Sequence, residues 1–504
     1  MSVRVRFAPS PTGALHIGGV RTALYNYLFA KKHNGTFILR IEDTDQNRFV
    51  EGAETYIEEA LLWAGIVPDE GVNAGGDFGP YRQSDRKGRY KDFADQLIAD
   101  DKAYYAFDTS EELDAMRDRL KEARVANPQY NAITRMQMKN SLTLSTEEVN
   151  ELIEQGHQYV VRIKLPRNED VRFKDIVRGW VVVNTATMDD KVLLKSDGMP
   201  TYHLANIVDD HQMNISHVIR GEEWLPSAPL HVLLYEYLGW EKPEFAHLPL
   251  LLKPDGNGKL SKRAADKLGF PIFPLNWTDP VTQELSKGFR EEGYLADAFI
   301  NFLSLLGWNP GGEKELFSMK DLIELFSLER INKAGAKFDI GKAKWFNEQY
   351  LKARSNEELA EQFNGLLDTP IEESRALLIV DALKERVTFI NEMVDAGRFF
   401  FEAPDAYDDK TVRKKWNQQA VDKLLGFANR LQGKEQIDKE EARQLLMSYL
   451  AEDETPLGHI MPALRLSLTG EAGGPDLMAI IEILEPSEVI TRIKKATEVI
   501  AIND

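Results

Sequence analysis

A chain of 504 residues is too long for one hydrophobic core, so we expect about two to four domains. With 43% hydrophobic and 28% charged residues, it has the composition of a folded globular protein. The lack of cysteine excludes disulfides, thiolate-bound zinc, iron–sulfur clusters and cysteine nucleophiles. The net charge of −19 argues against a general nucleic-acid binder and against a DNA partner, because phosphate binding needs local positive potential.

Local basic stretches nevertheless leave room for a basic face on this acidic protein. They are Arg82–Lys91, Arg162–Lys174 and Lys410–Lys415. Each of them alone is more readily explained as the solvated face of a helix or strand.

The first element in chain order is a strand. Residues 3–7 alternate Val and Arg, which is typical of a strand and unlike the apolar core of a signal peptide. The longest apolar runs, such as Phe302–Leu306 and Leu377–Val380, are far too short to span a membrane. We therefore expect a cytoplasmic protein with no membrane partner.

Helices and strands then alternate. A helical repeat covers Ile17–Lys32, a strand follows at Thr36–Ile41, and a second helix over Ala53–Ala64 ends at a glycine. This order predicts a parallel sheet with a right-handed crossover. Ligands of such sheets bind beyond the carboxyl ends of the strands, where Pro9–Gly19 and the acidic turn Glu42–Asp45 fall.

The pattern changes after the first hundred residues. A helix that opens at Ser145 is followed by β-rich stretches at Tyr159–Leu165 and Trp180–Asn184, which together indicate an inserted α+β unit. The parallel-sheet pattern then returns, with a strand at Val218–Arg220 and a helix at Ser227–Leu238. From about residue 270 onward, amphipathic helices dominate.

Two distant segments together describe an ATP site, and the first runs from Ala8 to Gly19. It places His16, Gly18 and Gly19 at the start of the first helix. Unpaired amides at a helix start attract phosphate, glycine lets a purine approach the backbone, and a histidine there can donate to phosphate oxygens. The alternative is a loop histidine beside glycines that serve only packing. The sequence has no P-loop motif.

The second segment is Lys259-Leu260-Ser261-Lys262-Arg263, which follows the turn-rich Lys253–Gly258. Flexible turns can close Lys259 and Lys262 over a triphosphate, where ammonium groups that meet charge mainly in the transition state accelerate the chemical step. The alternative is an exposed basic loop. The two segments together favour activation of a carboxylate with ATP.

Several longer motifs resemble those of one family. They are Arg6–Gly13, His16–Gly18, Arg40–Asp45, Gly79–Ser84, Lys195–Asn206, Ile219–Trp224, Lys259–Arg263, Pro462–Arg465 and Leu468–Gly470. In this order they resemble the bacterial-type glutamyl-tRNA synthetases, which are class I aminoacyl-tRNA synthetases. The two halves of the ATP site correspond to the HIGH and KMSKS signatures of that family.

The resemblance implies a fold of the α/β class. We expect a Rossmann-like parallel-sheet catalytic domain with an inserted α+β acceptor-binding domain, followed by all-α anticodon-binding domains. The catalytic halves would be residues 1–100 and 205–265, the second with the KLSKR loop. Residues 101–204 would bind the acceptor stem, residues 266–335 would contact the tRNA stem, and residues 336–504 would form the helical anticodon-binding region.

The resemblance also implies how the substrate is held. Arg6 and Arg220 would face substrate carboxylates, and Tyr202 would add a hydroxyl donor. Guanidinium forks suit a carboxylate better than a neutral amide, so they favour glutamate over glutamine. Glu42 would hold the substrate ammonium group.

Asn206 and Trp224 would line the amino-acid and ATP sites. The full expected set is catalytic His16, Lys259 and Lys262; ATP-binding Gly18, Gly19, Trp224, Lys259, Ser261 and Lys262; glutamate-binding Arg6, Ala8, Ser10, Glu42, Tyr202, Asn206 and Arg220; and tRNA-binding Arg48 and Arg386.

The implied substrates are L-glutamate, ATP with Mg²⁺, and tRNA(Glu), and the family suggests a monomer. The α-carboxylate of glutamate would attack the α-phosphorus of ATP and give glutamyl-adenylate and diphosphate. The 2′-hydroxyl of the terminal tRNA ribose would then attack this mixed anhydride. Positioning and electrostatic stabilisation suffice for both steps. The resemblance further implies that glutamate activation requires bound tRNA.

Two departures from the family pattern bear on the site. Gly19 occupies the fourth HIGH position instead of histidine, which removes one of the usual phosphate contacts. Many relatives hold zinc in the inserted domain with three cysteines and a histidine. The corresponding positions here are Ala106, Asp108, Thr134 and Met136. These residues cannot make such a site, so we predict neither zinc nor another resident metal.

The choice of tRNA is open at this point. A non-discriminating enzyme would also charge tRNA(Gln), and an amidotransferase would then correct the product. Aligning Glu385-Arg386-Val387 with the family places Arg386 at an anticodon contact, where an arginine would favour tRNA(Glu) alone.

Two further alternatives are disfavoured. Glutaminyl-tRNA synthetases have PEPNG and an acidic turn ending in Thr-Asn, where this chain has Pro9–Gly13 and Asp43–Asp45, and they end in β-barrels. An inactive tRNA-binding protein of the same fold is disfavoured by the intact His16, Lys259 and Lys262.

Overall fold

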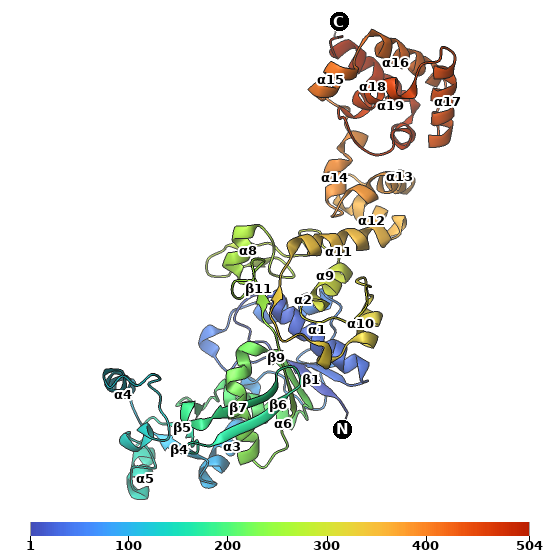
Figure 1. Ribbon diagram of the computed structural model, residues 1–504. Helices are drawn as coiled ribbons and strands as arrows, with labels where there is room; N and C mark the ends of the chain where they lie inside the picture. The colour runs from blue at the N-terminus through green and yellow to red at the C-terminus, as the bar shows by residue number, and fades with distance from the viewer. Residues whose placement is uncertain (1, 503–504) are drawn as a thin grey trace. The chain divides into compact units, whose positions relative to one another are not determined.

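The computed structural model describes residues 2–502 (Figure 1). The chain divides into two compact units, Met1–Glu292 with Ala296–Ala343, and Gly293–Leu295 with Lys344–Asp504. Residues 1, 503 and 504 lie outside the described part, so the outer ends of the first and last expected domains are not described.

A parallel sheet of three strands opens the first unit. Its strands and connecting helices are β1 (Arg4–Phe7), α1 (Ile17–Lys32), β2 (Thr36–Leu39), α2 (Ala53–Trp63) and β3 (Glu70–Gly71). β2 pairs in parallel with β1 and with β3, which confirms the predicted β–α–β–α order and its parallel sheet. β2 ends two residues before the predicted bound, because Ile41 makes only an isolated bridge with Arg82.

A second sheet, in the order β7-β6-β10-β9, lies beside the first. Its elements are β6 (Asp170–Asp175), β7 (Gly179–Asn184), α6 (Tyr202–Gln212), β9 (His217–Gly221), α7 (Ala228–Tyr237) and β10 (Glu244–Leu248). β10 is parallel to β9 and β6, and β6 is antiparallel to β7. Ser216 joins the sheets: its N–H donates to the Arg4 carbonyl, and its hydroxyl accepts from the Arg4 N–H, both at 2.9 Å. β1 and β9 therefore run side by side (Figure 1).

An antiparallel sheet in the order β4-β5-β8 forms the inserted part of the first unit. Its elements are α3 (Lys87–Ala99), β4 (Ala103–Ala106), α4 (Ser110–Glu122), α5 (Thr146–Glu154), β5 (Val160–Ile163) and β8 (Val192–Leu194). The predicted capping box opens α5: the Glu148 N–H donates to the Ser145 hydroxyl at 3.2 Å, and the Ser145 N–H to the Glu148 carboxylate at 2.8 Å. Gly156 follows with a φ of 76°, which ends the helix as expected.

Short elements complete the first unit. They are β11 (Leu251–Leu252), α8 (Lys262–Leu268), β12 (Trp277–Thr278), β13 (Leu285–Ser286), α9 (Ala296–Ser304), α10 (Met319–Leu325) and β14 (Ala336–Lys337). β12 and β13 form a two-stranded ribbon, and β11 pairs in parallel with β14. These short strands were not predicted, because a two-residue strand is too short to carry a periodic signal.

The second unit is helical in its described residues, which confirms the predicted helical C-terminal half. Its helices are α11 (Ile340–Ala353, which begins in the first unit), α12 (Asn356–Leu366), α13 (Glu373–Leu383), α14 (Glu392–Ala396), α15 (Asp409–Lys415), α16 (Gln418–Leu431), α17 (Lys439–Ala451), α18 (Leu457–Thr469) and α19 (Leu477–Val499). Their apolar faces bury one continuous core, with Trp416 among its largest side chains.

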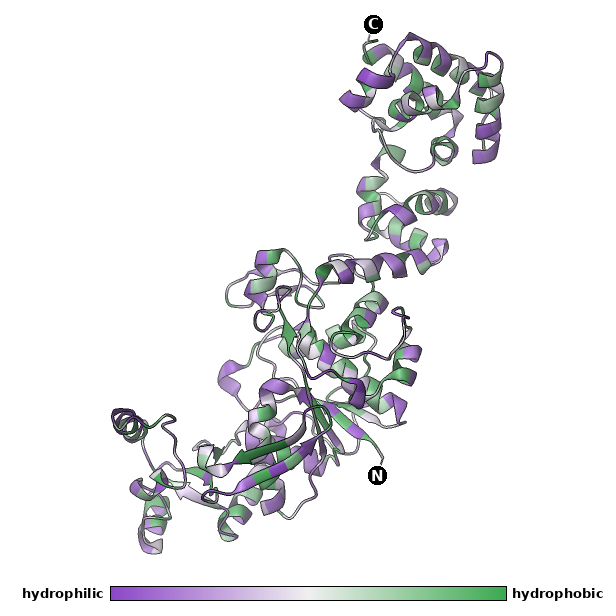
Figure 2. Ribbon diagram, in the orientation of Figure 1, coloured by the Kyte–Doolittle hydropathy of each residue, from purple (hydrophilic) through white to green (hydrophobic). Residues whose placement is uncertain are grey.

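The hydropathy of β6 matches its burial except at its last residue, the buried Asp175. β6 alternates hydrophilic and hydrophobic residues (Figure 2), and Val171, Phe173 and Asp175 are the buried ones. No helix among residues 2–502 has the length and the apolar content needed to cross a bilayer.

Candidate active site

A cavity of about 320 Å³ opens where β1 and β9 end. All seven residues predicted to bind glutamate line it, together with four predicted for ATP or catalysis. The eleven are Arg6, Ala8, Ser10, Glu42, Tyr202, Asn206, Arg220, His16, Gly18, Gly19 and Trp224. The fold thus brings together residues from both halves of the parallel-sheet region.

A neighbouring cavity of about 260 Å³ continues from the first toward the second signature. His16, Gly18 and Gly19 line both cavities, and Lys259 lines only the second. The Lys259 ammonium group lies 3.2 Å from the Glu223 carboxylate, which also borders both. The two predicted halves of the ATP site therefore meet here.

Ser261 and Lys262 are not among the described lining residues of either cavity. Ser261 precedes α8, and Lys262 is its first residue. The Lys262 ammonium group lies 3.4 Å from the exposed carboxylate of Glu284. In this conformation Lys262 is paired at the surface, so its predicted action on ATP requires movement of the segment.

Arg48 lies at the edge of the site. It lines a small cavity of about 80 Å³ that Glu42, Tyr202 and Trp224 also line. Its guanidinium donates to the Asp45 carboxylate at 2.6 Å, and the side chain is largely exposed. A nucleic-acid phosphate can therefore reach it.

His16 caps the start of α1. Its Nδ1 accepts a hydrogen bond from the Gly18 N–H at 3.0 Å, so the proton of the neutral ring resides on Nε2. Within residues 2–502 the buried Nε2 has no hydrogen-bond partner. Burial, and to a smaller extent the nearby Lys259, lower the pKa of His16 to about 4. At neutral pH the ring is neutral, and its buried Nε2–H is an unused donor in a residue that lines both cavities.

The lowered pKa of His16 makes stability depend on pH. The unfolded chain binds the proton near the ordinary pKa of 6.5, so the contribution of neutral His16 is complete above pH 6.5. It is lost as the pH falls toward 4, at about 1.4 kcal/mol per pH unit. We expect His16→Gln to reduce the loss of urea stability between pH 7.5 and 5, whereas His157→Gln at an exposed position keeps the wild-type slope. Equal slopes for His16→Gln and wild type would contradict this assignment.

Gly19 has a packing reason to be glycine. A Cβ atom at this position would lie 2.5 Å from Leu15 Cδ1 and 3.5 Å from Phe7 Cζ. A histidine here would require the Leu15 side chain to move. Gly19 stands where the HIGH pattern has its second histidine, and the side chain of Leu15 occupies the space that a larger residue at this position would need.

A buried ion network supports Arg6 and Glu42. Nε and Nη2 of Arg6 donate to Asp210 at 3.0 and 3.2 Å, and Nη1 of Arg40 donates to the same carboxylate at 2.7 Å. Arg40 also binds Glu42 at 2.9 Å, and the Asn206 amide donates to Glu42 at 3.2 Å. Burial opposes the charge, but Arg6 and Arg40 hold the pKa of Asp210 below its usual range. Glu42 is thereby fixed at the cavity wall as an acceptor.

Arg220 is held by a second buried cluster. Its guanidinium contacts the Tyr202 hydroxyl at 2.9 Å, His247 Nε2 at 3.1 Å and His231 Nδ1 at 3.3 Å. His247 in turn contacts the Asp175 carboxylate at 2.6 Å. Arg220, the two histidines and Asp175 are each at most 5% exposed.

Sequence reasoning missed Asp210, Asp175, His231, His247 and Glu223. The available signal was an ionisable residue among apolar neighbours: His231 in α7 and His247 in β10. Asp210 gave no such signal, because α6 also contains Asn206, Asp209 and His211. Such residues are rarely buried unless they are paired, but their partners lie far away in the sequence.

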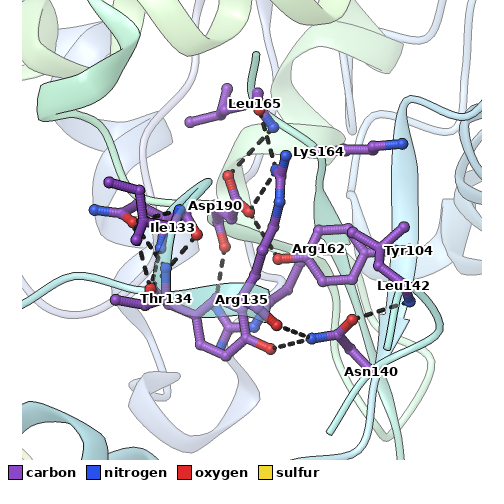
Figure 3. A network of polar contacts seen from close by, with 12 residues as sticks. Tyr104, Ile133, Thr134, Arg135, Asn140, Leu142, Arg162, Lys164, Leu165 and Asp190 are labelled. Carbon is purple, nitrogen blue, oxygen red and sulfur yellow. Dashed lines mark hydrogen bonds and ion pairs between the residues drawn. The ribbon is translucent and has the colours of Figure 1, made fainter. Parts of the chain in front are cut away.

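A network of hydrogen bonds surrounds Thr134 and Arg135 in the inserted domain (Figure 3). The Thr134 hydroxyl donates to the Gln129 carbonyl at 2.8 Å, and Asp108 accepts from the Tyr130 hydroxyl at 2.8 Å. Nearby, the buried Asp190 accepts from Tyr104 at 2.8 Å and from Arg135 at 3.0 Å. Direct polar contacts therefore stabilise this part of the inserted domain.

The absence of zinc stays a prediction. Among residues 2–502 no group of three or more histidine and carboxylate side chains is placed to hold a metal ion. We expect elemental analysis of the purified protein to find far less than one zinc per chain, and chelation to leave its thermal stability unchanged. About one zinc per chain after dialysis would contradict the prediction.

Arg386 lies in the second unit, at the end of the short helix η7 (Lys384–Arg386), and is exposed. It lies close enough to Arg465 to lower that residue's pKa, in addition to the larger effect of burial. The buried Nη1 of Arg465 has no hydrogen-bond partner within the described residues. The guanidinium groups of Arg386 and Arg465 thus lie near each other. Their combined positive charge and hydrogen-bond donors favour an anionic or acceptor-rich ligand.

Two known families together match residues 2–497 of this chain. The family of tRNA synthetases class I (E and Q), catalytic domain, matches residues 2–345, and the anticodon binding domain family matches residues 345–497.

Named relatives are similar over their full length. A glutamate–tRNA ligase of Cytophaga hutchinsonii is 58% identical over 98% of this chain and 97% of the relative. One of Phocaeicola vulgatus is 56% identical over 99% of each chain. The crystal structure of a glutamate tRNA ligase from Elizabethkingia meningosepticum in complex with its amino acid has a TM-score of 0.96 and 50% identity, and the match covers 99% of this chain and 100% of that one.

Proposed function

We infer that this chain, which belongs to the class I tRNA synthetases of the glutamate and glutamine type, is a glutamate–tRNA ligase. One observation carries the inference beyond the similarity: a single cavity brings Arg6, Tyr202 and Arg220 together with His16 and the glycines of the helix start. The first set suits a dicarboxylic amino acid, and the second suits a nucleotide phosphate.

In the proposed first step, the α-carboxylate of glutamate attacks the α-phosphorus of ATP and releases diphosphate. The His16 Nε2–H would donate to a phosphate oxygen, and Lys259 and Lys262 would follow the charge that develops on the departing diphosphate. Such donors act most strongly when they are already oriented before the reaction. Gly18 and Gly19 would let the nucleotide approach the start of α1, while Ser261 and Trp224 would complete the ATP site.

Mg²⁺ would arrive with the triphosphate. Enzymes that bind it in this way usually supply one or two carboxylates beside the phosphate oxygens. Glu223 borders both cavities and would fill this role once Lys259 turns toward the nucleotide. The ion would neutralise phosphate charge as the diphosphate leaves.

The wall of the cavity would select the amino acid. Arg6 and Arg220 offer only donors, and the Tyr202 hydroxyl, which accepts from Arg220, is left to donate to the ligand. A carboxylate has only acceptors, so it satisfies this arrangement better than an amide does. Glu42 would accept from the substrate ammonium, with Ala8, Ser10 and Asn206 lining the same site.

In the second step, the 2′-hydroxyl of the terminal ribose of tRNA(Glu) attacks the glutamyl-adenylate and releases AMP. Residues 101–204 would bind the acceptor stem, residues 266–335 the tRNA stem, and residues 336–504 the anticodon. Arg48, beside the cavity, would contact the tRNA. A monomeric state and a cytoplasmic location are parts of the same proposal.

Exchange of labelled diphosphate into ATP tests the first step. We expect exchange with glutamate only when tRNA is present, and little exchange with glutamine. Exchange that is independent of the amino acid, or that prefers glutamine, would overturn the proposal.

Arg386 supplies a prediction about tRNA choice. Because its exposed guanidinium lies near Arg465 in the second unit, Arg386→Gln should weaken the preference for tRNA(Glu) over tRNA(Gln) by about tenfold or more, the effect of one bidentate base contact. The preference is measured as the ratio of kcat/KM for the two tRNAs, with Arg398→Gln as an exposed control in the same unit. An unaltered ratio would remove Arg386 from anticodon recognition.

A further inference from the structure

The hydrogen bonds of the buried cluster around Arg220 all run outward from its guanidinium group. Arginine only donates hydrogen bonds, so each ring nitrogen that contacts it must accept. His247 Nε2, 3.1 Å from Arg220 Nε, is therefore unprotonated. His231 Nδ1, 3.3 Å from Arg220 Nη1, is unprotonated as well.

The tautomer of His247 is fixed from its other side. With Nε2 accepting, the proton lies on Nδ1, which donates to the Asp175 carboxylate at 2.6 Å. Asp175 is fully buried at the end of β6, and it is anchored by the backbone N–H groups of Val177 at 2.9 Å and Arg178 at 2.7 Å. The carboxylate thus sets the orientation of the imidazole, as outer partners of histidine ligands do elsewhere.

The tautomer of His231 is fixed in the same manner. With Nδ1 accepting from Arg220, its Nε2–H is directed to His203 Nδ1 at 3.2 Å. Burial, followed by the charge of Arg220, lowers the pKa of His231 well below its ordinary value. Both rings that face Arg220 are thus neutral acceptors under ordinary conditions.

These two histidines accept from Nε and Nη1 of Arg220, and its Nη2 donates to the Trp224 carbonyl at 3.5 Å. Both residues line the cavity, so the remaining donor capacity of the guanidinium and the hydroxyl proton of Tyr202 are available to a ligand there. As long as Arg220 is held in this way, Arg220 and Tyr202 offer hydrogen-bond donors to that ligand. An amide NH₂ placed there would lose its hydrogen bonds, which is costly in a buried site.

We propose that Asp175, His247 and His231 are positioning residues that hold Arg220 in this orientation and thereby set the preference for glutamate over glutamine. The proposal rests on the proposed function, because it assigns the side-chain carboxylate of glutamate to Arg220. A loosened Arg220 can turn away, and Tyr202, relieved of its donor, can then accept from the amide of glutamine.

The two histidines allow a crossed test. Asparagine places its amide near the position of Nδ1, and glutamine reaches the position of Nε2. Arg220 uses Nε2 of His247 but Nδ1 of His231. The acceptor toward Arg220 is therefore kept in His247→Gln and His231→Asn, and it is lost in His247→Asn and His231→Gln.

The measurement is the ratio of kcat/KM for glutamate to that for glutamine in tRNA-dependent diphosphate exchange. KM for ATP is measured in the same variants as a control. We expect His247→Asn and His231→Gln to lower the ratio by about 10- to 100-fold through the KM for glutamate, the effect of a lost hydrogen bond to a charged group. His247→Gln and His231→Asn should retain most of the ratio, and KM for ATP should stay within about twofold in all four, since the proposal assigns Arg220 to glutamate and not to ATP.

At His247 the glutamine variant should keep the ratio and the asparagine variant should lose it, and at His231 the order should be reversed. Histidines with only a general structural role would not give this reversal. Ratios that fall equally in all four variants, or that stay at the wild-type value in all four, would overturn the proposal. His211→Asn, on the surface of α6 and stacked on Trp240, controls for loss of a histidine. A wild-type protein without glutamate-dependent exchange would instead defeat the proposed function. If His247→Asn does not fold, the pair at His231 decides the question alone.

Discussion

Replacement of Lys262 with alanine is expected to lower kcat for tRNA-dependent diphosphate exchange by about 10²–10³-fold, the usual effect of removing one donor that stabilises transition-state charge. The KM for glutamate should change little, because Lys262 lies outside the cavity that would hold the amino acid. The measurement is steady-state exchange with varied glutamate at saturating ATP.

The present position of Lys262 is compatible with that role. Its pair with Glu284 has a 3.4 Å separation, and the Glu284 side chain is 67% exposed. Exposed pairs of this kind contribute about 0–1 kcal/mol, so little opposes the movement of the lysine toward a triphosphate. Glu284→Gln should therefore leave kcat unchanged or slightly raised.

Lys267, in the last turn of the same helix, supplies the matched control. Lys267→Ala removes the same charge from α8 without touching the second signature, and its kcat should remain within about twofold of wild type. A normal kcat for Lys262→Ala, or an equal loss for Lys267→Ala, would take Lys262 out of the mechanism.

Replacement of Asp210 with asparagine is expected to lower the free energy of unfolding of the first unit by about 3–5 kcal/mol. Arg6 and Arg40, each at most 3% exposed, share this one carboxylate, and its loss leaves buried guanidinium charge poorly compensated. The measurement is urea unfolding of the full chain at pH 7.5, where Asp210 is ionised because its pKa is depressed.

Asp95→Asn is the control for Asp210→Asn, since it removes the same charge from an exposed ion pair with Lys91 on α3. Its effect should stay below about 1 kcal/mol. Because Asp210 also orients Arg6, the KM for glutamate should rise in Asp210→Asn at temperatures where the protein remains folded. Equal unfolding midpoints for the two variants would contradict the role given to this network.

Local signals in the sequence predicted much of the fold. The bounds of α1 agree with the predicted Ile17–Lys32, because its apolar repeat is long and a glycine-rich turn precedes it. The capping box at Ser145 and the glycine after α2 were predicted correctly for the same reason: the residues that form each feature are neighbours in the chain. The seven residues that the family resemblance assigned to glutamate line one cavity, which opens where β1 and β9 end.

What could not be predicted depends on partners that are distant in sequence. The contact of Asp175 with His247 spans 72 residues, and that of Arg6 with Asp210 spans 204. Composition and periodicity carry no information about such pairs, because only the packing of β6, β10 and α6 brings them together. The surface position of Lys262 was also beyond prediction, since it depends on a contact with Glu284, which lies 22 residues away in the sequence.

The most direct test of the central claim is to charge total tRNA with labelled glutamate and ATP and then to separate the products by isoacceptor. We predict label on tRNA(Glu), and its absence from tRNA(Gln) would agree with the role given to Arg386. Label on both would identify a non-discriminating enzyme and require an amidotransferase downstream. No label on any tRNA, beside an active control enzyme, would contradict the account and favour a protein that only binds tRNA.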